Sequence, residues 1–176
     1  MLRLIALIVP LTLSLCAPAH ADERFMPYID WLTENSSFEY NGEELPTIRQ
    51  MPYAYLEVEV YGPENVAMAE RQGTELPKIH GAYRDDTNEM LYADDVDPWA
   101  WENRDTLVHE LVHFLQMVNG INDECVQKLE RPAYKLHWEW VEAHGYQDQF
   151  EEPNWLWVYV LEMACHEDPW QRHDAR

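Results

Sequence analysis

The spacing of hydrophobic and polar residues changes along the chain and predicts the order of its first elements. Residues 25–34 read as a short helix with a proline near its start. Residues 54–62 (AYLEVEVYG) alternate apolar and acidic side chains, so we predict a half-buried strand there. Residues 63–73 begin with Pro-Glu and end in glycine, as a helix does. Residues 78–95 have the pattern of a hairpin, with two short strands around Asp85 to Asn88.

The second half of the chain is predicted to be mainly helical. Residues 104–119 carry apolar side chains at helical spacing and are followed by Gly120, a typical helix end. Residues 122–145 form a further helical stretch, in which Pro132 predicts a kink or a break. Residues 152–165 are expected to close the chain as an apolar helix or strand. Because strands precede helices in this order, we expect an α+β fold.

The N-terminal residues have the pattern of an export signal. Arg3 gives a short positive region, residues 4–15 are apolar, and AHA at 19–21 presents small residues before the expected cleavage point. The apolar run is too short to span a bilayer. We therefore expect residues 1–21 to be a cleaved signal peptide and residues 22–176 to be one secreted or periplasmic domain without a membrane anchor.

Cysteine usage changes with this cleavage. Removal of the signal peptide takes away Cys16 and leaves Cys125 and Cys165. An oxidising compartment favours a disulfide between such a pair. Two separate buried thiols are the alternative.

Composition limits the size of the fold and its partners. The 176 residues suit a single domain, and the 47% hydrophobic content excludes a disordered acidic tail. The formal net charge of −21 repels nucleic acid and anionic lipid, so we expect neither as a partner. Such a charge favours solubility, and a preference for cationic substrates is the alternative.

The stretch DTLVHELVHFLQMVNG, residues 105–120, holds the candidate chemistry. Its apolar residues form one stripe, whereas His109, His113 and Gln116 fall on a separate line at i, i+4 and i+7. A spacing of four residues advances a helix by about 6 Å and rotates it by about 40°, which lets two imidazoles converge on one ion. A metal site is therefore favoured over an amphipathic helix with two unrelated surface histidines.

Glu110 supplies a third functional group in the same motif. It lies about 100° around the helix from His109, so it flanks the ion rather than binding it. Zinc takes nitrogen ligands at about 2.0–2.1 Å and lowers the pKa of its bound water to around 7. We therefore expect Zn²⁺ as the cofactor and Glu110 as the general base.

A catalytic zinc site needs a third protein ligand. A histidine six residues after the second, with glycine midway, is one arrangement, but Asn119 and Gln116 occupy these positions. A glutamate on the following helix is the other arrangement. We favour Glu130, because the nearby small residue Ala133 permits a close approach of the two helices. The acids on that helix that stay as alternatives are Glu139 and Glu142.

The segments HELVH (109–113) and LERPAY (129–134) together resemble the gluzincin branch of zincin-like metallopeptidases, particularly minimal secreted bacterial forms with a single domain. The resemblance covers roughly residues 78–145. It implies a small antiparallel or mixed sheet whose edge strand, residues 90–93, lies above the active-site helix, followed by a second ligand-bearing helix. It also implies Glu110 as the base and, as zinc ligands, His109, His113 and Glu130.

Two further side chains on the second helix are candidates for catalysis. Tyr134 and His137 follow Glu130 at i+4 and i+7, on roughly the same face. Either could donate to the oxyanion of a tetrahedral intermediate, Tyr134 being the nearer. The alternatives are a half-buried tyrosine with a satisfied hydroxyl group and a structural histidine.

These features predict a secreted or periplasmic zinc metallopeptidase that cleaves peptide or protein substrates with metal-activated water. A periplasmic binding or interaction protein, holding a metal for structural reasons or holding none, is the alternative. Mononuclear iron on two histidines and one carboxylate is a further possibility, since it uses the same ligand types.

Overall fold

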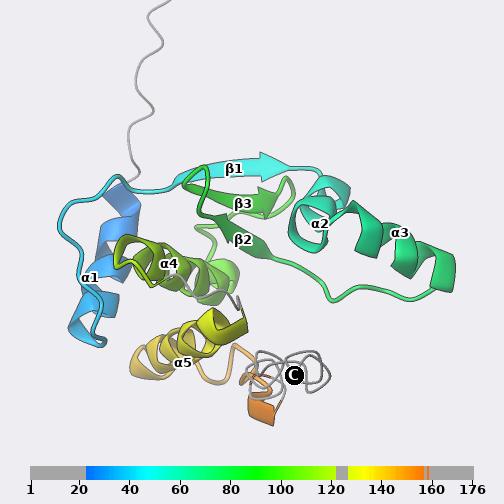
Figure 1. Ribbon diagram of the computed structural model, residues 1–176. Helices are drawn as coiled ribbons and strands as arrows, with labels where there is room; N and C mark the ends of the chain where they lie inside the picture. Colours follow the sequence, from blue (N-terminus) through cyan, green and yellow to red (C-terminus); the bar gives the residue numbers. More distant parts are fainter. Residues whose placement is uncertain (1–22, 122–126, 157, 159–176) are drawn as a thin grey trace, which may run out of the picture.

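The computed structural model describes residues 23–121, 127–156 and 158 (Figure 1). The predicted signal peptide and the three cysteines lie outside the described residues. Within the described part the elements are, in chain order, η1 (Glu23–Phe25), α1 (Met26–Glu34), β1 (Thr47–Met51), α2 (Tyr53–Tyr61), α3 (Pro63–Gln72), β2 (Gly81–Arg84), β3 (Glu89–Ala93), η2 (Trp101–Asn103), α4 (Arg104–Val118) and α5 (Gln127–Ala143).

The strands form a small mixed sheet in the order β1-β3-β2. β1 pairs with β3 in parallel, with Thr47 opposite Glu89. β2 pairs with β3 antiparallel, with Gly81 opposite Tyr92. The five helices and this sheet make the described part an α+β fold, as the sequence predicts.

Alternate residues of β3 face two different parts of the core, because successive side chains of a strand point to opposite faces of the sheet. Met90 and Tyr92 belong to the main core, together with residues of α1, α4 and α5. Leu91 and Ala93 belong to a smaller cluster that includes Leu56 of α2. The central strand is therefore buried on both sides.

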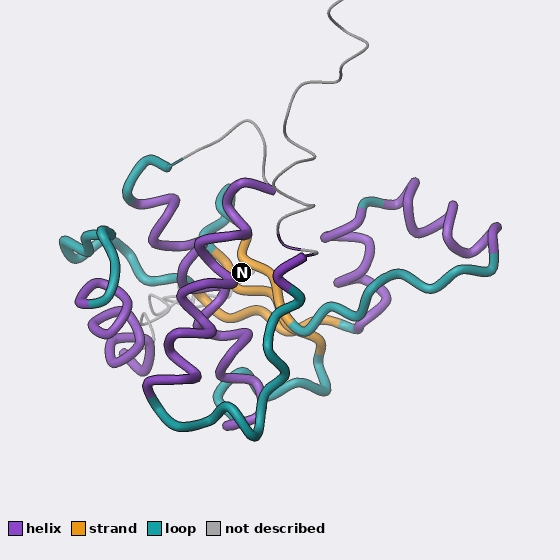
Figure 2. The backbone as a smooth tube through the Cα atoms, turned by 90° about the horizontal axis from the view of Figure 1, so that it is seen from below, coloured by secondary structure: helices purple, strands orange, loops and turns teal. Residues whose placement is uncertain are grey.

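The two long helices stack beneath the sheet. In Figure 1, α4 lies next to β2 and β3, and α5 lies on the far side of α4; in Figure 2 the helices lie in front of the strands. The predicted apolar stripe of α4 is buried, with Leu107, Leu111 and Leu115 fully inaccessible. Ala133 of α5 is also fully buried and lies in the same core. The small side chain lets α5 approach α4 closely.

The predicted strand at residues 54–62 is wrong, because residues Tyr53–Tyr61 form helix α2. Of the residues in that alternation, Leu56 is fully buried, whereas Val58 and Val60 are 37% and 42% exposed. Both sides of β3 are already paired with β1 and β2. The segment instead forms a single helix, which begins after Pro52 and ends before Gly62.

The hydrophobic pattern did not predict strand β1, and it is β2, not residues 90–93, that forms the edge of the sheet beside α4. β1 (TIRQM) lies within a polar, turn-rich passage, and as an edge strand it needs few apolar residues. Residues 90–93 belong to the central strand β3, whereas β2 is the edge strand nearest α4. Strands therefore do not all precede helices, since α2 and α3 lie between β1 and β2.

The other predicted elements are confirmed where they are described. The helices expected at 25–34, 63–73 and 104–119 correspond to α1, α3 and α4, and the hairpin corresponds to β2 and β3. Helix α5 continues through Pro132 without a break. Residues 152–156 and 158 of the apolar C-terminal segment are described, and the last three of them are helical. Among the described helices, none combines the length and apolar character needed to cross a membrane.

Gly81→Ala is expected to destabilise the fold by about 1–3 kcal/mol, because the new methyl group overpacks a buried contact. A Cβ at Gly81 would lie 2.8 Å from a ring carbon of Tyr92 and 3.1 Å from a methyl carbon of Thr106. Tyr92 is fully buried, so its ring cannot move without disturbing the core. Urea unfolding measures the loss. In a Tyr92→Leu background the same substitution should cost clearly less, and an equal loss in both backgrounds would contradict this explanation.

Candidate metal centre

Helix α4 brings two imidazoles together in its middle, on the face separate from its apolar stripe. His109 and His113 lie one turn apart, and their Nε2 atoms are 3.2 Å from each other. The imidazoles are part-buried, with 12% and 15% of their side-chain surfaces exposed. Because the apolar stripe of α4 fixes the rotation of the helix against the core, the histidine line faces α5.

Glu130 of α5 completes the cluster. Its Oε2 lies 3.2 Å from Nε2 of His109, and its Oε1 lies 3.6 Å from Nε2 of His113. The structure does not bring the alternative acids into this cluster: Glu139 forms an ion pair with Lys135 (2.7 Å), and Glu142 is exposed. Of the three acids weighed on this helix, Glu130 is the one beside the histidines.

The spacing of the three donors fits a metal ion. Ligands at about 2.0–2.1 Å in a tetrahedron lie about 3.3–3.4 Å from one another. The distance from Nε2 of His109 to Nε2 of His113 and that to Oε2 of Glu130 are both 3.2 Å, close to that value, whereas Nε2 of His113 lies 3.6 Å from the other carboxylate oxygen, Oε1. Within the described ranges, His109, His113 and Glu130 form a group that could hold a cation, with the ligand atoms within 4.8 Å of one another.

Glu110 stands beside this cluster without joining it. Its side chain is 6% exposed, and its Oε2 accepts a hydrogen bond of 2.7 Å from the backbone N–H of Tyr83. The edge strand β2 therefore fixes the orientation of this carboxylate. The alternation of hydrophobic residues could not reveal the contact, because the donor is a backbone group.

The two further candidates from α5 lie against His109 and against each other, with the ring centroids of Tyr134 and His137 5.6 Å apart. The ring of Tyr134 lies edge-on to the imidazole of His109, with centroids 4.7 Å apart. Nδ1 of His137 lies 3.3 Å from Nδ1 of His109, on the nitrogen that faces away from Glu130. His137 is therefore placed to orient His109, whereas Tyr134 lies against the cluster.

Gln116 is a member of the site that the sequence placed on the histidine line without giving it a role. It is 2% exposed, its Oε1 lies 2.9 Å from Nδ1 of His113, and its Nε2 donates to the carbonyl oxygen of Leu129 (2.8 Å). The spacing of three residues from His113 was the feature of the sequence that could have predicted this contact.

The charges of the cluster stabilise one another. Burial lowers the pKa of His109, but the hydrogen bond with Glu130 and nearby carboxylates outweigh it, so the pKa lies above 6.5. Burial raises the pKa of Glu130, but the hydrogen bond with His109 and the histidine charges outweigh it, so the pKa lies below 4.5. In the metal-free cluster each partner therefore favours the charged form of the other, the protonated imidazole of His109 and the ionised carboxylate of Glu130.

Two other groups near His109 are shifted chiefly by burial. Burial lowers the pKa of His137 to about 3, and the charge of His109 adds to this effect. Burial raises the pKa of the Tyr134 hydroxyl, as do the negative charges of Glu130 and Glu110. At neutral pH, His137 is an uncharged imidazole and Tyr134 keeps its proton.

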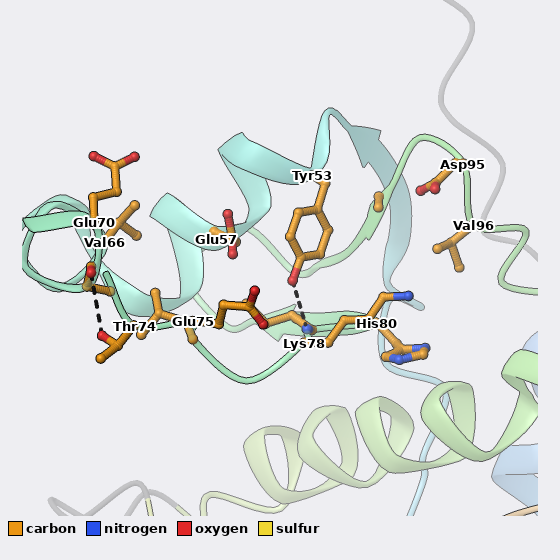
Figure 3. A pocket seen from close by; sticks show the side chains of 14 residues that line it. Tyr53, Glu57, Val66, Glu70, Thr74, Glu75, Lys78, His80, Asp95 and Val96 are labelled. Atoms are coloured by element: carbon orange, nitrogen blue, oxygen red, sulfur yellow. Dashed lines mark hydrogen bonds between the residues drawn. The ribbon is translucent and has the colours of Figure 1, made fainter. Parts of the chain in front are cut away.

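Two cavities lie away from the cluster. One, of about 510 Å³, is open to solvent and is lined by residues of α2 and α3, by residues between 74 and 80 and by the end of β3 (Figure 3). There the Tyr53 hydroxyl accepts a hydrogen bond from the backbone N–H of Ile79 (3.3 Å). The other, of about 520 Å³, is lined by residues including Arg24 and Trp99. None of the three predicted ligands lines either cavity. The candidate site is therefore identified by its cluster of metal-binding side chains and not by the size of a cavity.

Comparison with known proteins gives the family of the chain. A family model described as a domain of unknown function, DUF6647, matches residues 20–171. The chain belongs to the DUF6647 family. No curated protein and no solved structure matches it. The DUF6647 match covers every residue of the cluster, but its description assigns no chemistry to them.

In this DUF6647 protein, His137→Phe is expected to flatten the loss of stability at acid pH. The folded pKa of about 3 is below the ordinary 6.5, so between these values the unfolded chain binds the proton and the folded chain does not. The stability that neutral His137 contributes is therefore present above pH 6.5 and lost as the pH falls toward 3. The difference across this window is on the order of a few kcal/mol.

Urea unfolding of the chelator-treated protein at pH 7, 5.5 and 4 measures this loss. The wild type and His137→Phe are compared, and equal slopes for the two proteins would show that His137 does not control acid stability.

Proposed function

We propose that this protein is a zinc-dependent hydrolase, and specifically a metallopeptidase exported to the periplasm or the exterior. The observation that carries the proposal is the convergence of Nε2 of His109, Nε2 of His113 and the Glu130 carboxylate to within 3.2–3.6 Å of one another. The Glu110 carboxylate lies close enough to help raise the pKa of His109. Three protein ligands leave one corner open, which is the arrangement of catalytic rather than structural zinc sites.

His109, His113 and Glu130 would hold the ion. Zinc supplies a Lewis acid that polarises a carbonyl group and makes water acidic enough to attack near neutral pH. Two histidines and one carboxylate also suit iron. Zinc is preferred here because hydrolysis needs no change of oxidation state.

Glu110 accepts the proton of the attacking water. The hydrogen bond from Tyr83 holds Oε2 of this carboxylate at 2.7 Å, which leaves Oε1 as the oxygen that receives the proton. A general base must be positioned before it is effective, and its contribution is typically about 10²- to 10⁴-fold. The same carboxylic acid can then return the proton to the leaving amine.

Tyr134 stabilises the negative charge that develops on the substrate carbonyl oxygen. Its ring packs against His109, and its hydroxyl keeps its proton because burial and the nearby carboxylates raise its pKa. A protonated phenol close to the cluster can donate a hydrogen bond to an oxyanion. His137 stays behind His109, where it orients that ligand.

The substrate is proposed to be a peptide or an exposed protein segment. With a formal net charge of −21, the protein attracts cationic segments more strongly than anionic ones. The three proposed ligands line neither of the two cavities, and the side chains of His109 and His113 are 12% and 15% exposed.

Glu110→Gln is expected to lower peptide hydrolysis by at least about a hundredfold while zinc remains bound, because the amide keeps the shape of the side chain but cannot take a proton. Digestion of a peptide library with and without chelator gives the activity, and elemental analysis gives the zinc content. Glu139→Gln is the matched control, since Glu139 lies on α5 outside the cluster.

Two results would contradict the proposal. Full activity of Glu110→Gln would exclude the assigned base. A folded wild-type protein without metal and without hydrolysis would favour a binding or interaction protein instead.

A further inference from the structure

Gln116 is a buried amide with a partner on each of the two ligand-bearing helices. It belongs to α4, three residues after His113, and is 2% exposed. Its Oε1 lies 2.9 Å from Nδ1 of His113, and its Nε2 lies 2.8 Å from the carbonyl oxygen of Leu129 in α5. Buried amides are retained where both ends find hydrogen-bond partners.

The carbonyl oxygen of Leu129 determines the direction of every hydrogen bond in this chain of groups. A carbonyl oxygen only accepts, so the NH₂ end of Gln116 must face it. The oxygen end of Gln116 then faces His113, which must donate from Nδ1. A neutral imidazole carries one hydrogen, so Nε2 of His113 is left with a free lone pair.

That lone pair is at the atom that faces the metal cluster. Nε2 of His113 lies 3.2 Å from Nε2 of His109 and 3.6 Å from Oε1 of Glu130. A histidine binds a metal through a nitrogen that has no hydrogen. Gln116 therefore selects the tautomer of His113 that is ready for a cation.

The same amide also fixes the helix that carries Glu130. Leu129 directly precedes Glu130, so the hydrogen bond from Gln116 holds the backbone of α5 one residue before the third ligand. The outer nitrogen of His109 is less constrained, because its partner is another imidazole, His137, which can donate or accept. The donor and acceptor of each hydrogen bond are thus fixed at Gln116 but not between His109 and His137.

We propose that Gln116 is a positioning residue for metal binding, which sets the tautomer of His113 and holds the Glu130 segment of α5 against α4. The inference rests on the proposed metal function of the cluster. Gln116 contacts neither the substrate nor the ion; it acts through His113 and Leu129. Loss of such a partner behind a ligand typically lowers metal affinity by about 10- to 100-fold.

The test compares the full chain with three variants. Gln116→Met keeps the approximate volume and removes both hydrogen bonds. Gln116→Glu keeps an acceptor for His113 and removes the NH₂ donor to Leu129. Gln50→Met is the matched control, because Gln50 also donates to a backbone carbonyl, that of Val96 at 2.6 Å, but lies in β1.

Nitrogen-15 NMR of the chelator-treated proteins at pH 8 reports which nitrogen of His113 carries the hydrogen. We expect hydrogen on Nδ1 in the wild type, Gln50→Met and Gln116→Glu, and a shift toward Nε2 in Gln116→Met. Thermal unfolding verifies that each variant folds. If Gln116→Met does not fold, Gln116→Glu decides: hydrogen on Nε2 of His113 in that variant or in the wild type would overturn the proposal.

Zinc affinity, measured by competition with a chromophoric chelator, is the second readout. We expect Gln116→Met to bind zinc about 10- to 100-fold more weakly than the wild type and Gln50→Met to bind it equally well. Unchanged affinity and an unchanged tautomer in a folded Gln116→Met would overturn the inference while the metal function stands. A wild type that binds no zinc would refute the metal function, and the tautomer of His113 would still test the role of Gln116.

Discussion

The close packing of α5 against α4 is the constraint on which the site depends. The apolar stripe of α4 is buried against the sheet and α5, and Ala133 is fully inaccessible at the contact. A small residue there lets the two helix backbones approach, which brings Glu130 to within 3.2 Å of Nε2 of His109. Neither helix alone contains all three candidate ligands, so the cluster exists through tertiary packing rather than through the local motif.

Glu110, His109 and Gln116 are each held by a group from another element, because buried polar atoms need hydrogen-bond partners. The edge strand β2 holds Glu110 through the backbone of Tyr83. Helix α5 provides His137 behind His109 and the carbonyl oxygen of Leu129 behind Gln116. The sheet, α4 and α5 thus act together to fix the orientation of these side chains, which under the proposed metal function limits the conformational entropy lost when an ion binds.

The sequence predicted those elements whose spacing of apolar or histidine residues is compatible with a single type of secondary structure. The stripe of α4, the β2-β3 hairpin and the histidine pair are of this kind, and Glu130 followed from the small residue beside it. The alternation in residues 54–62 gave a wrong strand prediction. β3 is already paired with β1 and β2 on its two edges, and residues Tyr53–Tyr61 form helix α2 instead. The Tyr83 contact and the direction of the Gln116 hydrogen bonds involve backbone groups, which carry no sequence signature.

X-ray absorption spectroscopy of the purified protein loaded with one equivalent of zinc tests the three-ligand centre most directly. The expected first shell contains two imidazole nitrogens together with carboxylate and solvent oxygens at about 2.0–2.1 Å. His113→Ala should remove one imidazole, and Glu142→Gln, at an exposed position of α5, should leave the spectrum unchanged. A folded protein that binds no zinc, or a zinc shell without imidazole scattering, would contradict the assignment of His109, His113 and Glu130 as ligands.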